Sequence, residues 1–269
     1  YLALAATALG ALPILLYGSD EQKKKFLPAI ASGEILAAFA LTEANAGSDA
    51  PALKTTAKKD GDSYVLNGTK QWITNGENAQ VYTVMAKTNP AKGSRGISAF
   101  IVEKGTEGFS FGKHEDKMGI RASSTTELIF QDCRIPAENL LVREGMGLIV
   151  AINTFNYSRP GVGAQALGIA AGAFEDAVKY ARERVQFGQA ISSFQAIQHI
   201  LADMATEIEA ARALLYATAR TIDAGEKRFA KESAMTKLLC SDTAMKVTVD
   251  ALQVMAGYGY IREDPMEKR

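Results

Sequence analysis

The clearest structural signal in the chain is Tyr64-Val65-Leu66-Asn67-Gly68, followed by Thr69 to Thr74. Asn-Gly supplies the positive φ angles of a type I′ turn, so this stretch predicts a β-hairpin that turns at Asn67-Gly68. Further β-rich runs follow at residues 81–86, 96–102, 108–111 and 125–130. Several short strands joined by turns indicate a barrel or sandwich over about residues 38–140. The order strand, glycine loop, helix does not occur, which argues against a Rossmann dinucleotide site.

Helical patterns flank this β-rich middle. Residues 1–37 read helical, with Ser19-Asp20 capping a helix over 21–30 and Ser32-Gly33 closing it. From about residue 144 onward, apolar residues recur three and four apart in three long stretches, the last over about 226–257. We expect the apolar face of that last helix to be formed by Ala234, Leu238, Thr248, Leu252 and Met255. Three amphipathic helices joined by short loops predict an antiparallel bundle.

Composition narrows the class of protein. The 269 residues correspond to roughly two domains at about 150 residues each. Thirty basic residues balance thirty acidic ones. Because a nucleic-acid binder normally carries a basic excess, this balance argues against nonspecific nucleic-acid binding. Two cysteines, Cys133 and Cys240, make no disulfide framework, and with two histidines they argue against a zinc site, so we expect no metal. A reducing cytoplasm is the simplest compartment.

The first residues allow two interpretations. The chain opens on Tyr1 within a helical pattern, and we expect it to be a piece of a longer protein. Residues 1–19 carry no charge, which raises the alternative of a membrane span. Gly10, Pro13 and the lack of a basic segment favour a buried helix pair.

Two segments of the β-rich region carry residues with a chemical interpretation beside a structural one. In Phe39 to Asp49, Gly47 and Ser48 offer backbone N–H groups and a hydroxyl that suit a phosphate, although spacing alone favours an interdomain glycine turn. In Gln71-Trp72-Ile73-Thr74-Asn75-Gly76, the single tryptophan is either core or the cover of a planar cofactor.

Two segments of the helical region are similarly open. Arg184-Val-Gln-Phe187-Gly188, followed by Phe194-Gln195, places an arginine where it either satisfies helix-terminal carbonyls or meets a pyrophosphate. Gln253-Val-Met-Ala-Gly257-Tyr-Gly259-Tyr260 is either a helix C-cap or part of a ligand site.

In this order and at these separations, the four segments closely resemble the acyl-CoA dehydrogenase family of flavoproteins. Glu115-Asp-Lys-Met-Gly-Ile-Arg121 and Asp132-Cys-Arg-Ile-Pro136 match as well, so the resemblance covers essentially the whole chain. It implies an α+β protein with an all-α N-terminal part (1–37, the remnant of a larger helical domain). A middle antiparallel β-barrel (38–142) and a truncated C-terminal antiparallel helix bundle (143–269) follow. The family's quaternary structure implies a homotetramer.

The resemblance also implies FAD as cofactor, held between the β domain and the bundle. By motif match, the cofactor-binding residues of the β domain would be Phe39, Leu41, Thr42, Gly47, Ser48, Trp72, Ile73 and Thr74. Those reaching FAD from a neighbouring subunit would be Arg184, Phe187, Gln195, Gln253 and Gly257. The acyl-CoA substrate would face Ser48, Asn156, Tyr157, Ser158 and Arg159.

The reaction implied is α,β-dehydrogenation of an acyl-CoA thioester in fatty acid metabolism, with a short-chain or cyclic acyl group and an electron-transfer flavoprotein as electron acceptor. A carboxylate removes the α-proton, and hydrogen bonds to the thioester oxygen make that proton acidic enough. In most members this carboxylate lies beyond the segment matching Arg269, and Ser158 occupies the position that some members use instead. We therefore name no catalytic residue, and of the acids Glu43, Asp49 and Glu175 we expect capping or surface roles. Two alternatives stay open, an inactive flavin-binding or oligomerising module and an acyl-CoA oxidase. The location implied is the cytoplasm, or the mitochondrial matrix in a eukaryote.

Overall fold

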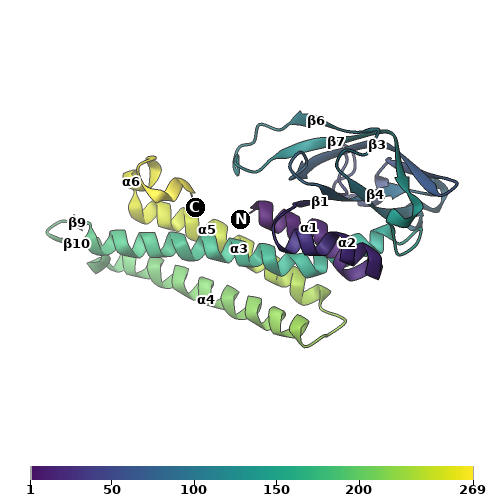
Figure 1. Cartoon of the computed structure of the whole chain (residues 1–269). Helices are drawn as coiled ribbons and strands as arrows, with labels where there is room; N and C mark the ends of the chain where they lie inside the picture. The colour runs from purple at the N-terminus through teal and green to yellow at the C-terminus, as the bar shows by residue number, and fades with distance from the viewer. Residues whose placement is uncertain (1, 269) are drawn as a thin grey trace. The chain divides into compact units, whose positions relative to one another are not determined.

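The computed structural model describes residues 2–268, which divide into two compact units (Figure 1). The first unit ends at Phe155 and the second begins at Asn156. The division falls inside the long helix α3 (Gly147–Glu183). Among the described residues, no helix combines the length and apolarity needed to cross a bilayer.

Two helices open the first unit, as expected. They are α1 (Leu2–Tyr17) and α2 (Asp20–Ala31). Ser19 and Gln22 form a reciprocal capping box, in which the Gln22 N–H donates to Ser19 Oγ (3.2 Å) and the Ser19 N–H to Gln22 Oε1 (2.9 Å). Helix α1 packs closely on the sheet, because a Cβ at Gly10 would lie 2.6 Å from the backbone nitrogen of Ala38. The uncharged segment is therefore a core helix.

One eight-stranded sheet fills the rest of this unit (Figure 1). Its strands are β1 (Ala37–Ala40), β2 (Thr56–Asp60), β3 (Ser63–Thr74), β4 (Val81–Lys87), β5 (Ile97–Glu103), β6 (Phe109–His114), β7 (Thr125–Pro136) and β8 (Leu140–Leu141). Short 3-10 turns lie at Ala50–Ala52, Pro90–Gly96 and Ala137–Asn139. The strand order is β6-β7-β3-β2-β4-β5-β8, with β1 paired to β4.

The predicted antiparallel barrel needs two corrections. Over the described residues the sheet stays open, since β6 and β8 end the hydrogen-bonded path. It is also mixed, because β1 and β2 each pair with β4 in parallel. A parallel pair needs a long crossover connection, and the chain between β1 and β4 is long enough to provide it. The all-α, β-rich, all-α order of the fold class is confirmed.

The predicted hairpin turn at Asn67-Gly68 is wrong. The turn lies at Gly61-Asp62, where Asp60 pairs with Ser63, and Gly61 has φ +58°. Asn67 and Gly68 instead lie inside the single strand β3, at a register shift against β7. Asn67 and Asp132 exchange hydrogen bonds across this bulge (3.0 and 2.8 Å). Gly68 is required because a Cβ there would lie 2.5 Å from Thr55 Oγ1.

The second unit is an antiparallel helical bundle, as predicted. Helix α3 is followed by a short hairpin of β9 (Val185–Gln186) and β10 (Gln189–Ala190), then a 3-10 turn (Ile191–Ser193). Helices α4 (Gln195–Asp223), α5 (Ala230–Met255) and α6 (Gly257–Tyr260) complete it, with a last turn at Pro265–Lys268. Its core is built largely from small residues, with Ala170, Ala173, Ala177, Ala181 and Ala211 fully buried.

The buried face of α5 differs from the predicted one. Leu238 is 60% exposed and Ala234 and Leu252 are exposed, whereas Met255 is buried as expected. The buried face consists mainly of small and hydroxyl side chains, namely Ser233, Thr236, Cys240, Thr243, Val247, Ala251 and Val254. These hydroxyls are satisfied inside the bundle, for example by the Thr218–Thr236 hydrogen bond of 2.7 Å.

Candidate functional site

Two of the four sequence segments lie side by side in the first unit. The Gln71 N–H donates to the Thr42 carbonyl (2.8 Å), so the chain leaving β1 runs beside β3. Trp72 follows directly and is 55% exposed, while Thr42 is half-buried. The structure therefore places an exposed indole beside the Thr42 segment.

A bulge in β3 turns Trp72 outward. Tyr64, Leu66 and Lys70 alternate on the buried face of the strand, and the next residue in phase would be Trp72. A register shift against β7 between Lys70 and Ile73 inserts a residue, so Ile73 is buried instead. Trp72 has φ +56°, a left-handed conformation that costs a bulky residue on the order of 1–2 kcal/mol. Strain of this kind is found at ligand sites.

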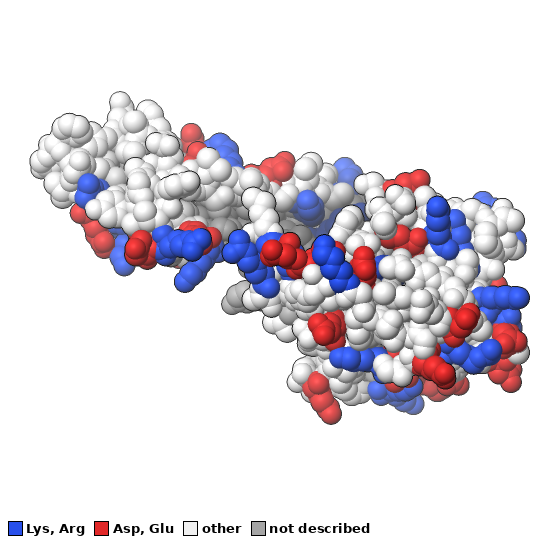
Figure 2. All heavy atoms as spheres, turned by 90° about the horizontal axis from the view of Figure 1, so that it is seen from above, with Lys and Arg blue, Asp and Glu red and all other residues white. Residues whose placement is uncertain are grey.

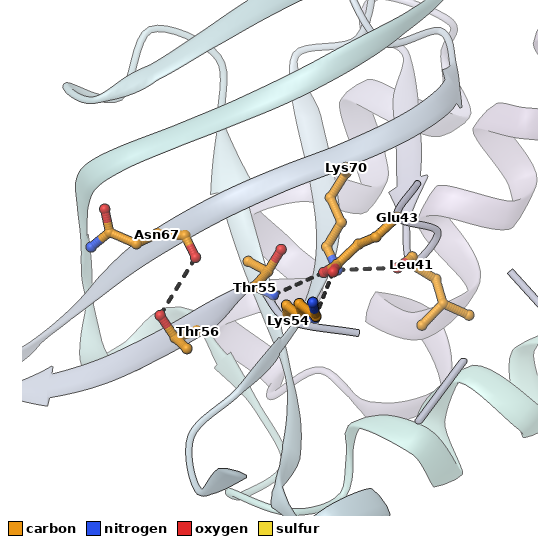
Figure 3. Close-up of polar contacts among 7 residues, drawn as sticks. All are labelled: Leu41, Glu43, Lys54, Thr55, Thr56, Asn67 and Lys70. Carbon is orange, nitrogen blue, oxygen red and sulfur yellow. Dashed lines mark hydrogen bonds and ion pairs between the residues drawn. The ribbon is translucent and has the colours of Figure 1, made fainter. Parts of the chain in front are cut away.

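A buried ion pair joins β3 to the segment that follows β1 (Figure 3). Lys70 Nζ is 2.8 Å from Glu43 Oε1 and donates to the Leu41 carbonyl (3.1 Å). The Glu43 carboxylate also accepts the N–H groups of Lys54 (2.5 Å) and Thr55 (2.9 Å). Burial lowers the pKa of Lys70 to about 8, although the nearby Glu43 carboxylate acts to raise it. Burial would raise the pKa of Glu43, but the Lys70 charge and the donated hydrogen bonds outweigh it and hold that pKa below its usual value.

The Gly47–Ser48 segment is exposed at the end of a tight turn. Glu43 and Ala46 exchange both backbone hydrogen bonds (3.1 and 3.0 Å), which fixes the chain immediately before it. A Cβ at Gly47 would meet no atom within 4 Å, so a ligand could approach this backbone closely. In contrast, Leu41 and Ile73 point into the core, and Phe39 packs edge-on against Phe155 (5.5 Å between ring centroids). Only backbone groups of Leu41 and Ile73 are available to a ligand.

The other two segments meet in the second unit. A cavity of about 430 Å³ is lined by Tyr180, Arg184, Gln186, Ile191, Val254, Ala256, Gly257, Tyr258 and Ile261. The Arg184 guanidinium lies 5.4 Å from the centre of the Tyr258 ring. Arg184 thus stacks on an aromatic ring within a cavity, an arrangement that suits anion binding by a guanidinium.

Three further predicted residues lie outside that cavity lining. Phe187 and Gly188 form the turn of the β9–β10 hairpin with φ +54° and +77°, and the Phe187 ring is 94% exposed. Gln195 and Gln253 are exposed on α4 and α5. The structure gathers Arg184 and Gly257 into one site and leaves Phe187, Gln195 and Gln253 at its exterior.

The predicted substrate segment, residues 156–159, lies within α3. Arg159 Nη1 donates to Asn156 Oδ1 (2.6 Å), and the Tyr157 ring meets Phe229 edge-on at 4.8 Å, while Ser158 is half-buried. Pro160 lies in the interior of α3, although proline is common in the first turn of a helix. Because Pro160 has no N–H, the Asn156 carbonyl lacks its helical partner, and the Ser233 hydroxyl of α5 donates to it.

The three acids considered as bases fall into different environments. Glu43 is buried in the ion pair, so a surface role is wrong for it, and its carboxylate bonds the backbone N–H groups of Lys54 and Thr55. Asp49 and Glu175 are exposed. Over residues 2–268, no cluster of three or more His, Cys, Asp or Glu side chains could hold a metal ion.

Comparisons with known proteins agree along the chain. Family models described as acyl-CoA dehydrogenase N-terminal, middle and C-terminal domain match residues 1–34, 38–133 and 145–269. The short-chain specific acyl-CoA dehydrogenase of Megasphaera elsdenii is 50% identical over 98% of this chain and 69% of its own length. The acryloyl-CoA reductase (NADH) of Anaerotignum propionicum is 55% identical over 94% of this chain and 64% of its own.

A solved structure described as the electron transferring flavoprotein of Acidaminococcus fermentans contains a chain 53% identical to this one. Its TM-score is 0.96, over 99% of this chain and 70% of that one. The chain belongs to the acyl-CoA dehydrogenase family. This acyl-CoA dehydrogenase is accordingly a FAD-dependent oxidoreductase, and it spans about two thirds of the length of its curated relatives.

The described residues of this acyl-CoA dehydrogenase fit FAD in each unit separately. The outward, strained Trp72 offers an aromatic face to a planar ring, and Arg184 in its cavity offers paired donors to a pyrophosphate. Lys70 is a functional candidate that the motifs did not indicate. The position of Lys70 in the strand could have indicated it. Lys70 lies four residues after the buried Leu66 and therefore on the same face of the strand, where a charged side chain needs a partner.

Proposed function

We propose that this acyl-CoA dehydrogenase removes the α- and β-hydrogens of short-chain acyl-CoA thioesters. The observation that carries the proposal is the exposed, left-handed Trp72 beside the Thr42 segment, which fits a flavin cover. The preference for short chains is supported by the names of the two relatives, one short-chain specific and one an acryloyl-CoA reductase.

Some of the predicted site residues would bind the cofactor and others the substrate. When bound, FAD supplies a hydride acceptor for the β-carbon. Trp72 and Thr74 would cover one face of the flavin ring and Thr42 would bond its edge, while Arg184 and Gly257 of a neighbouring copy would hold the pyrophosphate end. The exposed Ser48 hydroxyl would bond the thioester oxygen of the acyl-CoA, and the Arg159 guanidinium would bond one of the phosphates of its CoA part. We assign the α-proton to no carboxylate among the described residues.

We also propose a homotetramer, in which copies of this chain cover α5. Large apolar side chains follow one exposed face of that helix at helical spacing, namely Met235, Leu238, Leu239, Met245 and Val249. The opposite face of α5 is buried in the bundle, so the helix is apolar on both sides, as in a helix buried at an interface.

Electron-transfer flavoprotein is the acceptor we propose, supported by the solved structure named for it. On the face shown in Figure 2, Lys and Arg side chains alternate with Asp and Glu, so partner recognition there would rest on local charge pairs. A cytoplasmic location is likewise proposed, supported by two buried free thiols, Cys133 and Cys240.

Purified full-length protein tests the proposal through its absorbance. It should carry a bound yellow chromophore that bleaches anaerobically on addition of butyryl-CoA. Trp72→Ala should lose bound FAD, and Trp72→Phe, which keeps an aromatic face, should retain most of it. A colourless protein would refute the assignment. Bound FAD without bleaching would favour the inactive module, and peroxide release during turnover would favour the oxidase.

A further inference from the structure

The Glu43–Lys70 pair is unusual in being almost completely buried. The Lys70 side chain is 0% exposed and that of Glu43 is 9% exposed, whereas Lys25–Glu103 on the same unit is about half exposed. Removing two charges from water carries a large desolvation penalty, so a buried pair contributes less stability than its short distance suggests. Packing alone gives no reason for a lysine on the inner face of β3, because an apolar residue would fill that position.

Each contact of the pair holds one stretch of backbone. Lys70 Nζ binds the Leu41 carbonyl, and the next residue of β3 binds the next carbonyl, Thr42, through its N–H (3.1 and 2.8 Å). Glu43 itself begins the tight turn that ends at Ala46. Leu41, Thr42 and Glu43 are thus fastened in succession to the strand that presents Trp72.

The carboxylate connects this stretch to a third segment. Glu43 accepts the N–H groups of Lys54 and Thr55, at the entrance to β2 (Figure 3). Thr55 in turn packs against Gly68 of β3, where there is no room for a Cβ. One carboxylate therefore fixes three backbone segments around the outward-turned indole.

We propose that Glu43 and Lys70 are positioning residues for the flavin: they hold residues 41–48 in register with Trp72, and so determine how tightly FAD is bound. This inference rests on the proposed function, in which residues 41–48 and Trp72 face the flavin. Both side chains are buried, so they would act on the flavin through the backbone that they fix.

The double variant Glu43→Gln/Lys70→Met in the full chain separates positioning from stability. It removes both charges together, so no unpaired charge remains buried, and the amide can still accept an N–H of Lys54 or Thr55. We expect FAD titrated into apoprotein to bind at least tenfold more weakly and the visible flavin spectrum to shift. Lys25→Met, which breaks the exposed Lys25–Glu103 pair, should change neither.

Two further measurements keep the test decisive. Glu43→Asp retains the charge but shortens its reach, and it should weaken FAD binding even if the double variant fails to fold. Amide exchange of residues 41–48 should quicken in each variant that folds. If the folded variants bind FAD with wild-type affinity and spectrum, the pair is merely structural and the inference is wrong. A wild-type protein that binds no FAD would instead refute the proposed function on which the inference rests.

Discussion

Replacing Ser233 by alanine tests how the bundle tolerates a proline inside α3. Pro160 deprives the Asn156 carbonyl of its helical N–H, and the fully buried Ser233 hydroxyl supplies the missing donor. Ser233→Ala leaves that carbonyl without this donor. An unsatisfied buried group costs about 1–3 kcal/mol, and because the Asn156 carbonyl is only partly buried we expect about 1–2 kcal/mol.

A double-mutant cycle with Pro160→Ala tests whether the cost of Ser233→Ala depends on the proline. The alanine in that variant has an N–H that can bond to the Asn156 carbonyl, so the Ser233 hydroxyl becomes redundant. In that background, Ser233→Ala should cost under about 0.5 kcal/mol, giving a coupling energy near 1 kcal/mol. Urea unfolding followed by far-ultraviolet circular dichroism measures each free energy of unfolding.

A matched control lies on the same helix. The Ser241 hydroxyl donates to the Leu238 carbonyl of α5 (3.0 Å), and Ser241→Ala should change the free energy of unfolding by under about 0.5 kcal/mol. Equal costs of Ser233→Ala in the wild-type and Pro160→Ala backgrounds would refute the assignment of Ser233 as the substitute donor.

Three other perturbations give separate expectations. Gly68→Ala should lower the free energy of unfolding by about 1–3 kcal/mol, because its Cβ would overlap Thr55, and Gly61→Ala, which meets open space at φ +58°, should cost less. Since the folded pKa of Glu43 lies below its ordinary 4.5, the unfolded state binds the proton more readily. The stability advantage of wild type over Glu43→Gln should therefore be complete above pH 4.5, as long as the pH stays below the Lys70 pKa of about 8, and it should shrink as pH falls below 4.5. Arg184→Lys should weaken FAD binding about tenfold in a fluorescence titration, while Arg182→Lys, exposed in the last turn of α3, should not; equal affinities would leave Arg184 only its contact with Tyr258.

The order of elements could be predicted from hydrophobic period, but the position of the turn could not. Asn67-Gly68 has the composition of a type I′ turn, and local propensity favours that interpretation. The glycine is there for a different reason, the close approach of Thr55, which is a contact made only once the sheet has formed. The chain turns instead at Gly61-Asp62. Local sequence therefore could not distinguish a turn glycine from a close-packing one.

The buried face of α5 was missed for a related reason. Hydrophobicity selects Leu238 and Leu252, yet the bundle buries Ser233 and Thr236. Small hydroxyl side chains permit close helix packing when their hydrogen bonds are satisfied internally, as Thr236 is by Thr218. Larger apolar residues then remain on the outside, available to another copy. An interface between copies cannot be separated from a core by periodicity within one chain.

The site could be predicted only as far as its motifs extend. Trp72 and Thr42 came from the family resemblance, and the structure brings their segments together. Lys70 breaks the rule that a buried strand position is apolar, and Trp72 breaks the rule of alternation. Both departures occur in one strand, within three residues, beside the same bulge.

The buried Lys70 and the outward-turned Trp72 at one bulge together indicate a functional site. A sequence usually satisfies propensity, pattern and packing together, and it departs from them where a site requires it. Here the bulge exposes an indole at a strained φ, and the residue two positions before it carries a buried charge that fastens the adjoining backbone. If the bulge only ended the pairing of β3 and β7, neither the exposed ring nor the buried charge would be needed. The flavin that we propose on the outer side of Trp72 would account for both features, because the backbone beneath it would have to be held in place.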